Sequence, residues 1–198
     1  MDYTKKFEHI RKFTKKSVKK SRYEHSQRVA QLCVEIAEKY GLDKEKAYLA
    51  GIGHDMCKDL SDEKMLETAE RDGLPIIDFE RKKISLLHGR AAAVVMKEKF
   101  GITDADVLEA VANHTSGIVG MCDLTKCLYI ADKIEPGRPH SSKEYVEQML
   151  ELPFEELFYK IMKDNYNFII SKGYEVFPGT EKMMNQSEEK MNKMVGIK

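Results

Sequence analysis

Apolar residues recur every three or four positions along most of this chain, with charged residues between them. In residues 22–40, for example, Val29, Leu32, Cys33 and Ile36 fall on one face of a helix. Similar stripes predict helices at about residues 4–20, 43–54, 61–71, 86–100, 103–114, 123–134, 142–150 and 153–171. No stretch keeps the two-residue alternation of a β-strand for long. The pattern therefore predicts an all-α fold, a single helical bundle.

Several predicted helices have residues at their ends that favour starting or stopping a helix. Ser21 and Ser61 are expected N-caps, and Gly41 is expected to end the helix at 22–40. Pro153 suits the first turn of a helix.

The end of the chain shows a weaker pattern. We expect a turn at residues 178–180 (Pro-Gly-Thr) and a polar, loosely packed segment after it. We accordingly expect one domain over residues 1–185 and a flexible C-terminal tail over residues 186–198.

Composition narrows the classes of protein to consider. The 198 residues include 33 basic and 33 acidic side chains, and this balance argues against a nucleic-acid binder, which normally carries a basic excess. No apolar run is long enough to cross a bilayer, and the charged N-terminus does not look like a secretory signal. The four cysteines form no CxxC pair. We therefore expect a cytoplasmic protein with no membrane or nucleic-acid partner.

Five of the predicted helices carry a side chain able to bind a metal at the end of an apolar stripe. These side chains are His25, His54 with Asp55, His88, His114 and Asp132. A single histidine on a buried face is more often a core residue than a ligand. Four on separate helices, with two carboxylates, would be costly to bury without a shared partner. Mixed imidazole and carboxylate ligation suits iron, manganese or zinc, and the pattern does not choose among them.

The order H…HD…H…H…D resembles that of the HD-domain metal-dependent phosphohydrolases. Short motifs around these residues resemble those of one bacterial branch of the family, the YqeK-like symmetrical bis(5'-nucleosyl)-tetraphosphatases, or diadenosine tetraphosphate hydrolases. The resemblance covers about Thr4 to Asn185. The matching words are RYEHSQRVAQLC at Arg22, AGIGHDMCKDL at Ala50, LLHGRAAA at Leu86, ANHTSG at Ala112 and YIADKIEPGRP at Tyr129.

The resemblance implies roles for individual residues. The implied ligands of a catalytic iron are His25, His54, Asp55 and Asp132. His88 and His114 are implied either as phosphate contacts or as ligands of a second ion. Further substrate contacts are implied for Lys58, Thr115 and Arg138. The family often has an HPxT motif near its C-terminus, and the matching residues 177–180 are FPGT here. Phe177 takes the usual histidine position, and Thr180 is retained.

The activity implied by the resemblance is symmetrical hydrolysis of diadenosine tetraphosphate to two ADP. Water activated by the metal would attack an inner phosphorus, with Asp55 orienting it and with Lys58, Arg138, His88 and His114 stabilising the developing charge. Two alternatives stay open at this point. One is a related hydrolase acting on nucleoside mono- or triphosphates, and the other is a module that senses nucleotides without cleaving them. A homodimer is compatible with the family.

Overall fold

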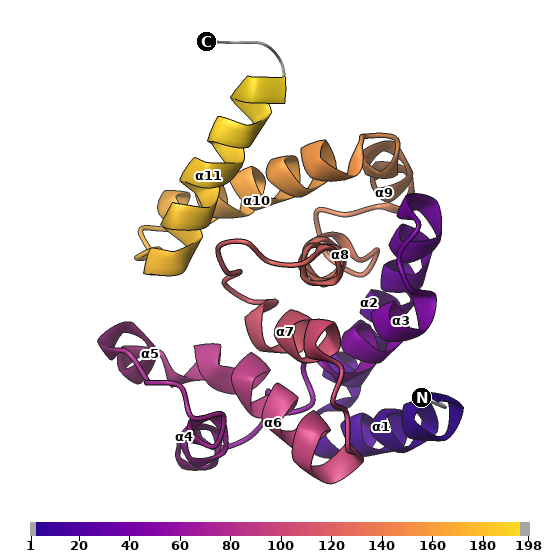
Figure 1. Cartoon of the computed structure of the whole chain (residues 1–198), viewed down its shortest axis with the longest axis vertical. Helices are drawn as coiled ribbons and strands as arrows, with labels where there is room; N and C mark the ends of the chain where they lie inside the picture. Colours follow the sequence, from indigo (N-terminus) through magenta and orange to yellow (C-terminus); the bar gives the residue numbers. More distant parts are fainter. Residues whose placement is uncertain (1–2, 195–198) are drawn as a thin grey trace.

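A computed structural model describes residues 3–194, and every regular element within them is a helix (Figure 1). The prediction of an all-α fold is therefore confirmed. The α-helices are α1 (Tyr3–Ser17), α2 (Lys20–Tyr40), α3 (Lys44–Gly53), α4 (Asp62–Glu70), α5 (Asp78–Lys82), α6 (His88–Phe100), α7 (Ala105–Asn113), α8 (Asp123–Ile134), α9 (Lys143–Leu150), α10 (Phe154–Ser171) and α11 (Pro178–Met194). A short 3-10 helix, Ile84–Leu87, leads directly into α6.

The start of α2 differs from the prediction. Its N-cap is Lys19 rather than Ser21, so Ser21 lies in the first turn. The Lys19 side chain makes no capping hydrogen bond, but its backbone N–H donates to Asp59 Oδ2 at 2.8 Å. The Asp59 carboxylate, which follows α3, therefore accepts a hydrogen bond from the backbone at the start of α2. The local sequence around residue 21 does not reveal this contact. The other two predicted ends are correct: Ser61 caps α4, and Gly41 ends α2 with a φ of 74°.

The C-terminal part also differs in detail. Pro153 is the N-cap of α10, one position before its first turn. Residues 178–180 are the first turn of α11 rather than an isolated turn, and proline is well suited to that position because its missing N–H has no partner there anyway. The same helix runs through position 185 to Met194, and residues 195–198 of the expected tail lie outside the described part. The division into a domain and a tail stays a prediction.

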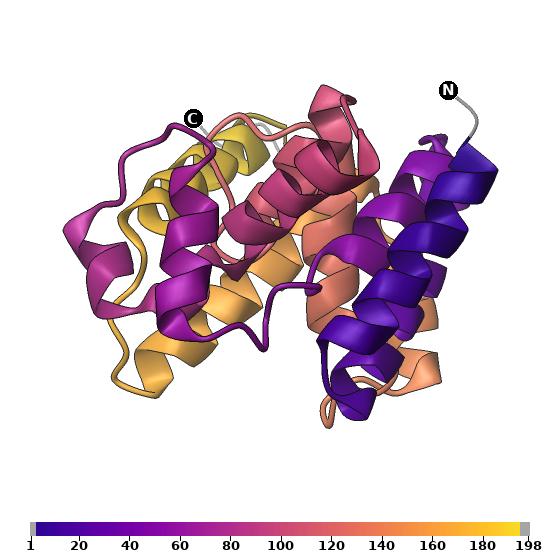
Figure 2. The same cartoon turned by 90° about the horizontal axis from the view of Figure 1, so that it is seen from below.

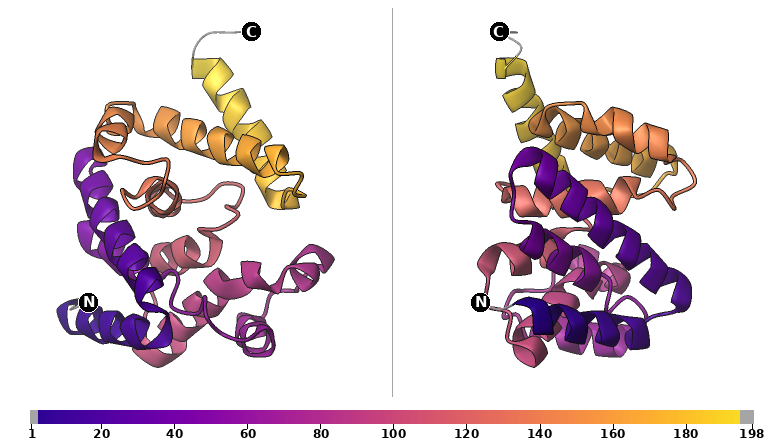
Figure 3. Two further views of the ribbon diagram at one scale, coloured as in Figure 1. Left: turned by 180° about the vertical axis from the view of Figure 1, so that it is seen from behind. Right: turned by 90° about the vertical axis from the view of Figure 1, so that its right-hand side faces the viewer.

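Helix α8 is at the centre of the molecule. In Figure 1 it is seen end-on, between α10 above it and α7 below it, and α2, α3, α7 and α10 all contact it. Figures 2 and 3 show α1 and α11 at opposite ends of the molecule. Most α8 residues are buried, so Asp132, near the end of this helix, is held in the interior.

Two glycines allow the helices that carry the histidines to approach closely. A Cβ atom at Gly51 of α3 would lie 2.6 Å from Ala30 Cα of α2. A Cβ at Gly89 of α6 would lie 2.7 Å from the Val111 carbonyl oxygen of α7. Since real Cβ contacts are not this short, any larger residue would force these backbones apart.

Among the described residues, none of the helices combines the length and the apolar character that a bilayer crossing would require.

Candidate metal centre

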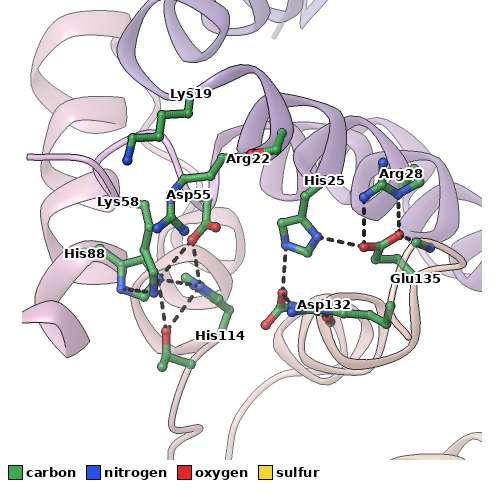
Figure 4. Close-up of a pocket in the computed structure, with 14 residues that line it drawn as sticks. Lys19, Arg22, His25, Arg28, Asp55, Lys58, His88, His114, Asp132 and Glu135 are labelled. Carbon is green, nitrogen blue, oxygen red and sulfur yellow. Dashed lines mark hydrogen bonds and ion pairs between the residues drawn. The ribbon is translucent and has the colours of Figure 1, made fainter. Parts of the chain in front are cut away.

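The four predicted metal ligands, together with His88 and His114, meet where several helix ends come together. His54 and Asp55 follow the last turn of α3, His114 follows α7, and His88 is the first residue of α6. His25 lies in α2 and Asp132 in α8. Figure 4 shows His88, His114 and Asp55 on one side of a cavity, with His25 and Asp132 opposite. His25 is partly buried, and the other five are buried.

Each of the four histidines has its Nδ1 bonded away from the centre. Nδ1 of His54, His88 and His114 lies 2.7–2.8 Å from the carbonyl oxygen three residues earlier in the chain. Nδ1 of His25 lies 3.0 Å from Glu135 Oε1. Because a carbonyl can only accept, Nδ1 carries the proton in the first three, and the unprotonated Nε2 is directed inward. This is the tautomer that a metal-binding imidazole needs.

The inward nitrogen of His54 is the strongest sign of an ion. His54 is fully buried, and its Nε2 has no hydrogen-bond partner among the described residues. It lies 3.8 Å from Asp55 Oδ2 and 3.9 Å from Asp132 Oδ1, too far for a hydrogen bond. Burial lowers the pKa of His54 to about 3, so the ring is neutral near pH 7. A lone pair aimed between two carboxylates fits a divalent cation.

Two groups of donors converge on Asp55. The first consists of His25, His54 and Asp55, and the second of Asp55, His88 and His114; within each group the ligand atoms lie within 4.8 Å of one another. Nε2 of His88 is 3.0 Å from Asp55 Oδ1 and 3.0 Å from His114 Nε2. The arrangement therefore has donors for one ion beside His54, and for a second beside His88 with Asp55 between them.

Both aspartates are held in the ionised form. Burial alone would favour the neutral acid at Asp132, but Lys133 at 2.8 Å and His25 at 3.0 Å outweigh it and keep the pKa of this carboxyl well below its usual value. Burial is likewise outweighed at Asp55, where the close imidazoles of His54, His114 and His88 keep the pKa of this carboxyl well below its usual value. Ionised carboxylates are the form that binds cations.

Glu135 and Arg28 form a support for His25 that the sequence pattern does not single out. Glu135 is 1% exposed and bonds His25, Arg28 and the backbone N–H of Gly137. Burial opposes ionisation of Glu135, but hydrogen bonds from His25 and Arg28 lower its pKa to about 2. The anionic carboxylate therefore fixes the orientation of the His25 ring. Helical spacing could have indicated Arg28, since it lies three residues after His25 on the same face.

Five of the six residues line a cavity of about 430 Å³, here called the central cavity, and the fully buried His54 lies behind them. Cationic side chains line it: Lys19, Arg22, Arg28, Lys58 and Arg138. Figure 4 shows Lys19, Arg22 and Lys58 together on one side. Nζ of Lys58 is 3.1 Å from both ring nitrogens of His88, and burial lowers its pKa. A rim of cations above a buried cluster of histidines and aspartates suits a phosphorylated anion.

The other predicted substrate contacts separate into two groups. Lys58, Thr115 and Arg138 line the central cavity, and Arg138 Nη2 also donates to Asp132 Oδ1 at 2.7 Å. Phe177 and Thr180 do not reach it. They line an adjacent cavity of about 490 Å³, which shares Thr115 with the central cavity and is called the Phe177 cavity below. Lys19 and Arg22 are lining residues that the sequence pattern did not identify.

Comparison with known proteins agrees with the resemblance found in the sequence. The model of the HD domain family matches residues 22–137, a range that holds the four predicted metal ligands as well as His88 and His114. A symmetrical bis(5'-nucleosyl)-tetraphosphatase of Bacillus subtilis (strain 168) is 32% identical over 168 residues, 84% of this chain and 89% of the relative. The protein of the same name from Staphylococcus aureus (strain NCTC 8325 / PS 47) is 32% identical over 182 residues, 90% of this chain and 92% of the relative.

A solved structure agrees with the fold. It is described as a predicted HD superfamily hydrolase involved in NAD metabolism, from Clostridium acetobutylicum, and superposes with a TM-score of 0.85 at 32% identity. The match covers 93% of this chain and 97% of the other. The resemblance found in the sequence is therefore confirmed. The order of the histidines and aspartates along the sequence and the similarity to these relatives lead to the same assignment. The chain belongs to the HD domain family.

Proposed function

We propose that this protein is a metal-dependent hydrolase that cleaves diadenosine tetraphosphate symmetrically into two ADP. The observation that carries the proposal is the placing of two groups of metal donors, joined at Asp55, beneath a cavity lined with cations. The names of the Bacillus and Staphylococcus relatives supply the substrate. A polyphosphate bridge presents several negative charges in a row, and the cationic rim is suited to neutralise them.

His25, His54, Asp55 and Asp132 would hold the principal ion, for which we propose iron, with manganese or zinc as alternatives. His88 and His114 would hold a second ion or bind phosphate directly. When bound, a divalent ion lowers the pKa of a water molecule to near neutral and neutralises phosphate charge.

The side chains of the central cavity would position the reacting groups. The ionised Asp55 accepts a hydrogen bond from the attacking water and directs it towards an inner phosphorus. The bond from that phosphorus to the bridging oxygen breaks, and one ADP departs as an anion. Lys58 and Arg138 stabilise the charge on the departing group, and Thr115 offers a hydroxyl to a phosphoryl oxygen.

The Phe177 cavity would take one adenosine. Its wall includes the aromatic rings of Phe79 and Phe177, whose centroids lie 5.6 Å apart in an edge-to-face pair. Phe177 replaces a polar residue of the family motif, so we expect the base to be held there by stacking more than by hydrogen bonding. Thr180 is committed to the backbone, since its hydroxyl donates to the Ser116 carbonyl at 2.7 Å.

We also propose a cytoplasmic location and a homodimer, the arrangement compatible with the family.

Turnover assays with matched substrates test the activity. The purified protein, freed of metal and then loaded with ferrous iron or manganese, should release ADP as the sole nucleotide product from diadenosine tetraphosphate. Nucleoside mono- and triphosphates should be much poorer substrates. Asp55→Ala should abolish turnover, whereas His9→Asn, an exposed position outside the centre, should not change it. Absence of ADP, or preferred cleavage of a triphosphate, would overturn the proposal.

A further inference from the structure

A third cavity, of about 610 Å³, lies beside the metal centre and is not lined by Thr115. It shares Asp132 and Arg138 with the central cavity and meets the Phe177 cavity at Lys133 and Asn165. It is lined by residues of α8, α9 and α10, and Figure 1 shows α10 above the central helix α8. We call it the Phe168 cavity. The two outer cavities thus adjoin the central cavity at different residues, the Phe177 cavity at Thr115 and the Phe168 cavity at Asp132 and Arg138.

The walls of the Phe168 cavity combine apolar surface with polar groups. Phe168 of α10 is 57% exposed at this cavity, an unusual position for a large aromatic side chain, and Tyr145 of α9 and Ile161 add to the apolar surface. Asp164 and Asn165 supply polar side chains beside them. A purine nucleoside needs the same combination, with an aromatic face for stacking and polar groups for its edge and its sugar.

The proposed substrate requires two such places. Diadenosine tetraphosphate carries a nucleoside at each end of its phosphate bridge, and symmetrical cleavage puts the middle of that bridge at the metal centre. Each nucleoside therefore needs a place of its own outside the central cavity. The Phe177 cavity offers one exit past Thr115, and the Phe168 cavity offers the other past Arg138.

We infer that the Phe168 cavity binds the second nucleoside of the dinucleotide, with the base against Phe168, an assignment that rests on the proposed function. Arg138 stands at the junction of the two cavities and would contact the phosphate next to this nucleoside. The site as a whole then selects for length, because only a substrate with a nucleoside at both ends fills both outer cavities.

Helix α10 provides a matched pair of variants for the test. Phe168 and Ile170 lie on the same helix and are exposed to a similar extent, 57% and 50%, but of these two only Phe168 lines the cavity. Both side chains lie outside the packed core, so neither truncation should disturb folding, which thermal unfolding will verify. Phe168→Ala should lower kcat/KM for diadenosine tetraphosphate about tenfold, mainly through KM, as expected for a lost base stack. Ile170→Ala should stay within about twofold of the wild type.

A double variant tests whether two separate nucleosides are bound. If the two cavities hold opposite ends of the substrate, the losses in Phe168→Ala and Phe177→Ala should multiply in the combined variant. If the wild type releases ADP but Phe168→Ala matches Ile170→Ala, the inference fails while the proposed activity stands. A less than multiplicative double variant would also overturn it, because both side chains would then serve one base. Failure of the wild type to release ADP would instead reject the proposed function itself.

Discussion

At the scale of single residues, the metal centre depends on which ring nitrogen of each histidine faces inward. Three of the four rings are fixed by carbonyls of their own chain segment, through the spacing of three residues. The fourth, His25, depends on Glu135, which is 110 residues away in the sequence. His25 is therefore the proposed ligand whose orientation a single substitution elsewhere can disturb.

Replacing Glu135 by glutamine should weaken metal binding without removing a ligand. The amide keeps the shape of the side chain but loses the charge that holds Arg28 and orients the His25 ring. We expect the affinity for manganese, titrated into the metal-free protein, to fall about 10- to 100-fold. Turnover at saturating metal should fall much less. Glu151→Gln, which removes an exposed partner of Lys39, is the control and should leave both values unchanged. An unaltered metal affinity in Glu135→Gln would contradict this role.

The pKa of His54 predicts how the stability of the metal-free protein depends on pH. The ordinary histidine pKa of 6.5 falls to about 3 in the folded chain, chiefly because the ring is buried. Between these values the unfolded chain binds a proton that the folded chain does not, so the free energy of unfolding decreases as pH falls below 6.5. The pKa of His25 is raised, and its effect therefore lies above 6.5, outside this window.

Urea unfolding in the presence of a chelator, from about pH 7 to about pH 4, measures this dependence. The wild type should lose stability steadily over the range. His54→Asn, which cannot take up a proton there, should show a shallower slope, whatever its stability at neutral pH. Equal slopes for the two proteins would show that His54 does not titrate as its burial requires.

At the scale of helices, the local sequence pattern predicted where the helices lie better than it predicted which residues contact one another. Helix α8 begins at Asp123 and ends at Ile134, as its apolar stripe predicts, because nearly all of that stripe is buried. The short helix α5 was not predicted, since five residues are too few to show helical periodicity. Its N-terminus is stabilised by the Glu80 side chain, which accepts from Ile77 N–H and is bonded by Arg90 of α6.

The residues of the site also divide into those that local periodicity predicts and those that only the packing of distant segments brings into place. The apolar stripes lead to His25, His88 and His114 because these residues continue buried helix faces, and the structure brings them together. The contributions of Glu135, Lys19 and Arg22 depend on how distant segments pack. Arg22, for instance, is held at the cavity through Asp59, 2.8 Å from its Nε, which belongs to the segment after α3. No spacing within α2 encodes that contact.

The close contact of α6 with α7 gives a prediction at this scale. Gly89→Ala would place a methyl group 2.7 Å from the Val111 carbonyl oxygen and 3.2 Å from His114 Cε1, so the two helices must separate. Overpacking should lower the free energy of unfolding by about 1–3 kcal/mol. The better helix propensity of alanine should offset about 1 kcal/mol of this loss. Turnover should fall further than stability suggests, by about 100-fold, because His88 and His114 lose their relative position.

A second glycine provides the comparison for this substitution. At Gly53 the new methyl would meet the Met96 sulfur at 2.9 Å, and this flexible side chain can move aside. Gly53→Ala should therefore keep most of the activity. If Gly89→Ala were equally active, the approach of α6 to α7 would not be what positions the two histidines.

At the scale of the whole molecule, the metal centre joins segments that are distant in sequence. The donors come from α2, the ends of α3 and α7, the start of α6 and α8, and α8 itself contacts α2, α3 and α7. The buried His54 Nε2, which has no hydrogen-bond partner among the described residues, lies 3.8–3.9 Å from the two ionised carboxylates. An ion bound there therefore stabilises the folded chain as a whole, since the unfolded chain cannot assemble these donors.

Removal of the metal should accordingly lower the melting temperature of the entire protein. Free manganese at about a hundred times its Kd should add about 2.7 kcal/mol of stability, which corresponds to a rise in Tm of about 5–10 °C for a chain of this size. Calorimetry of the metal-free protein, with and without manganese, measures the shift. His54→Asn should abolish it, and the exposed His9→Asn should retain it in full. A shift that survives in His54→Asn would place the stabilising ion elsewhere in the molecule, because no other described side chain aims an unpaired buried nitrogen between the two carboxylates.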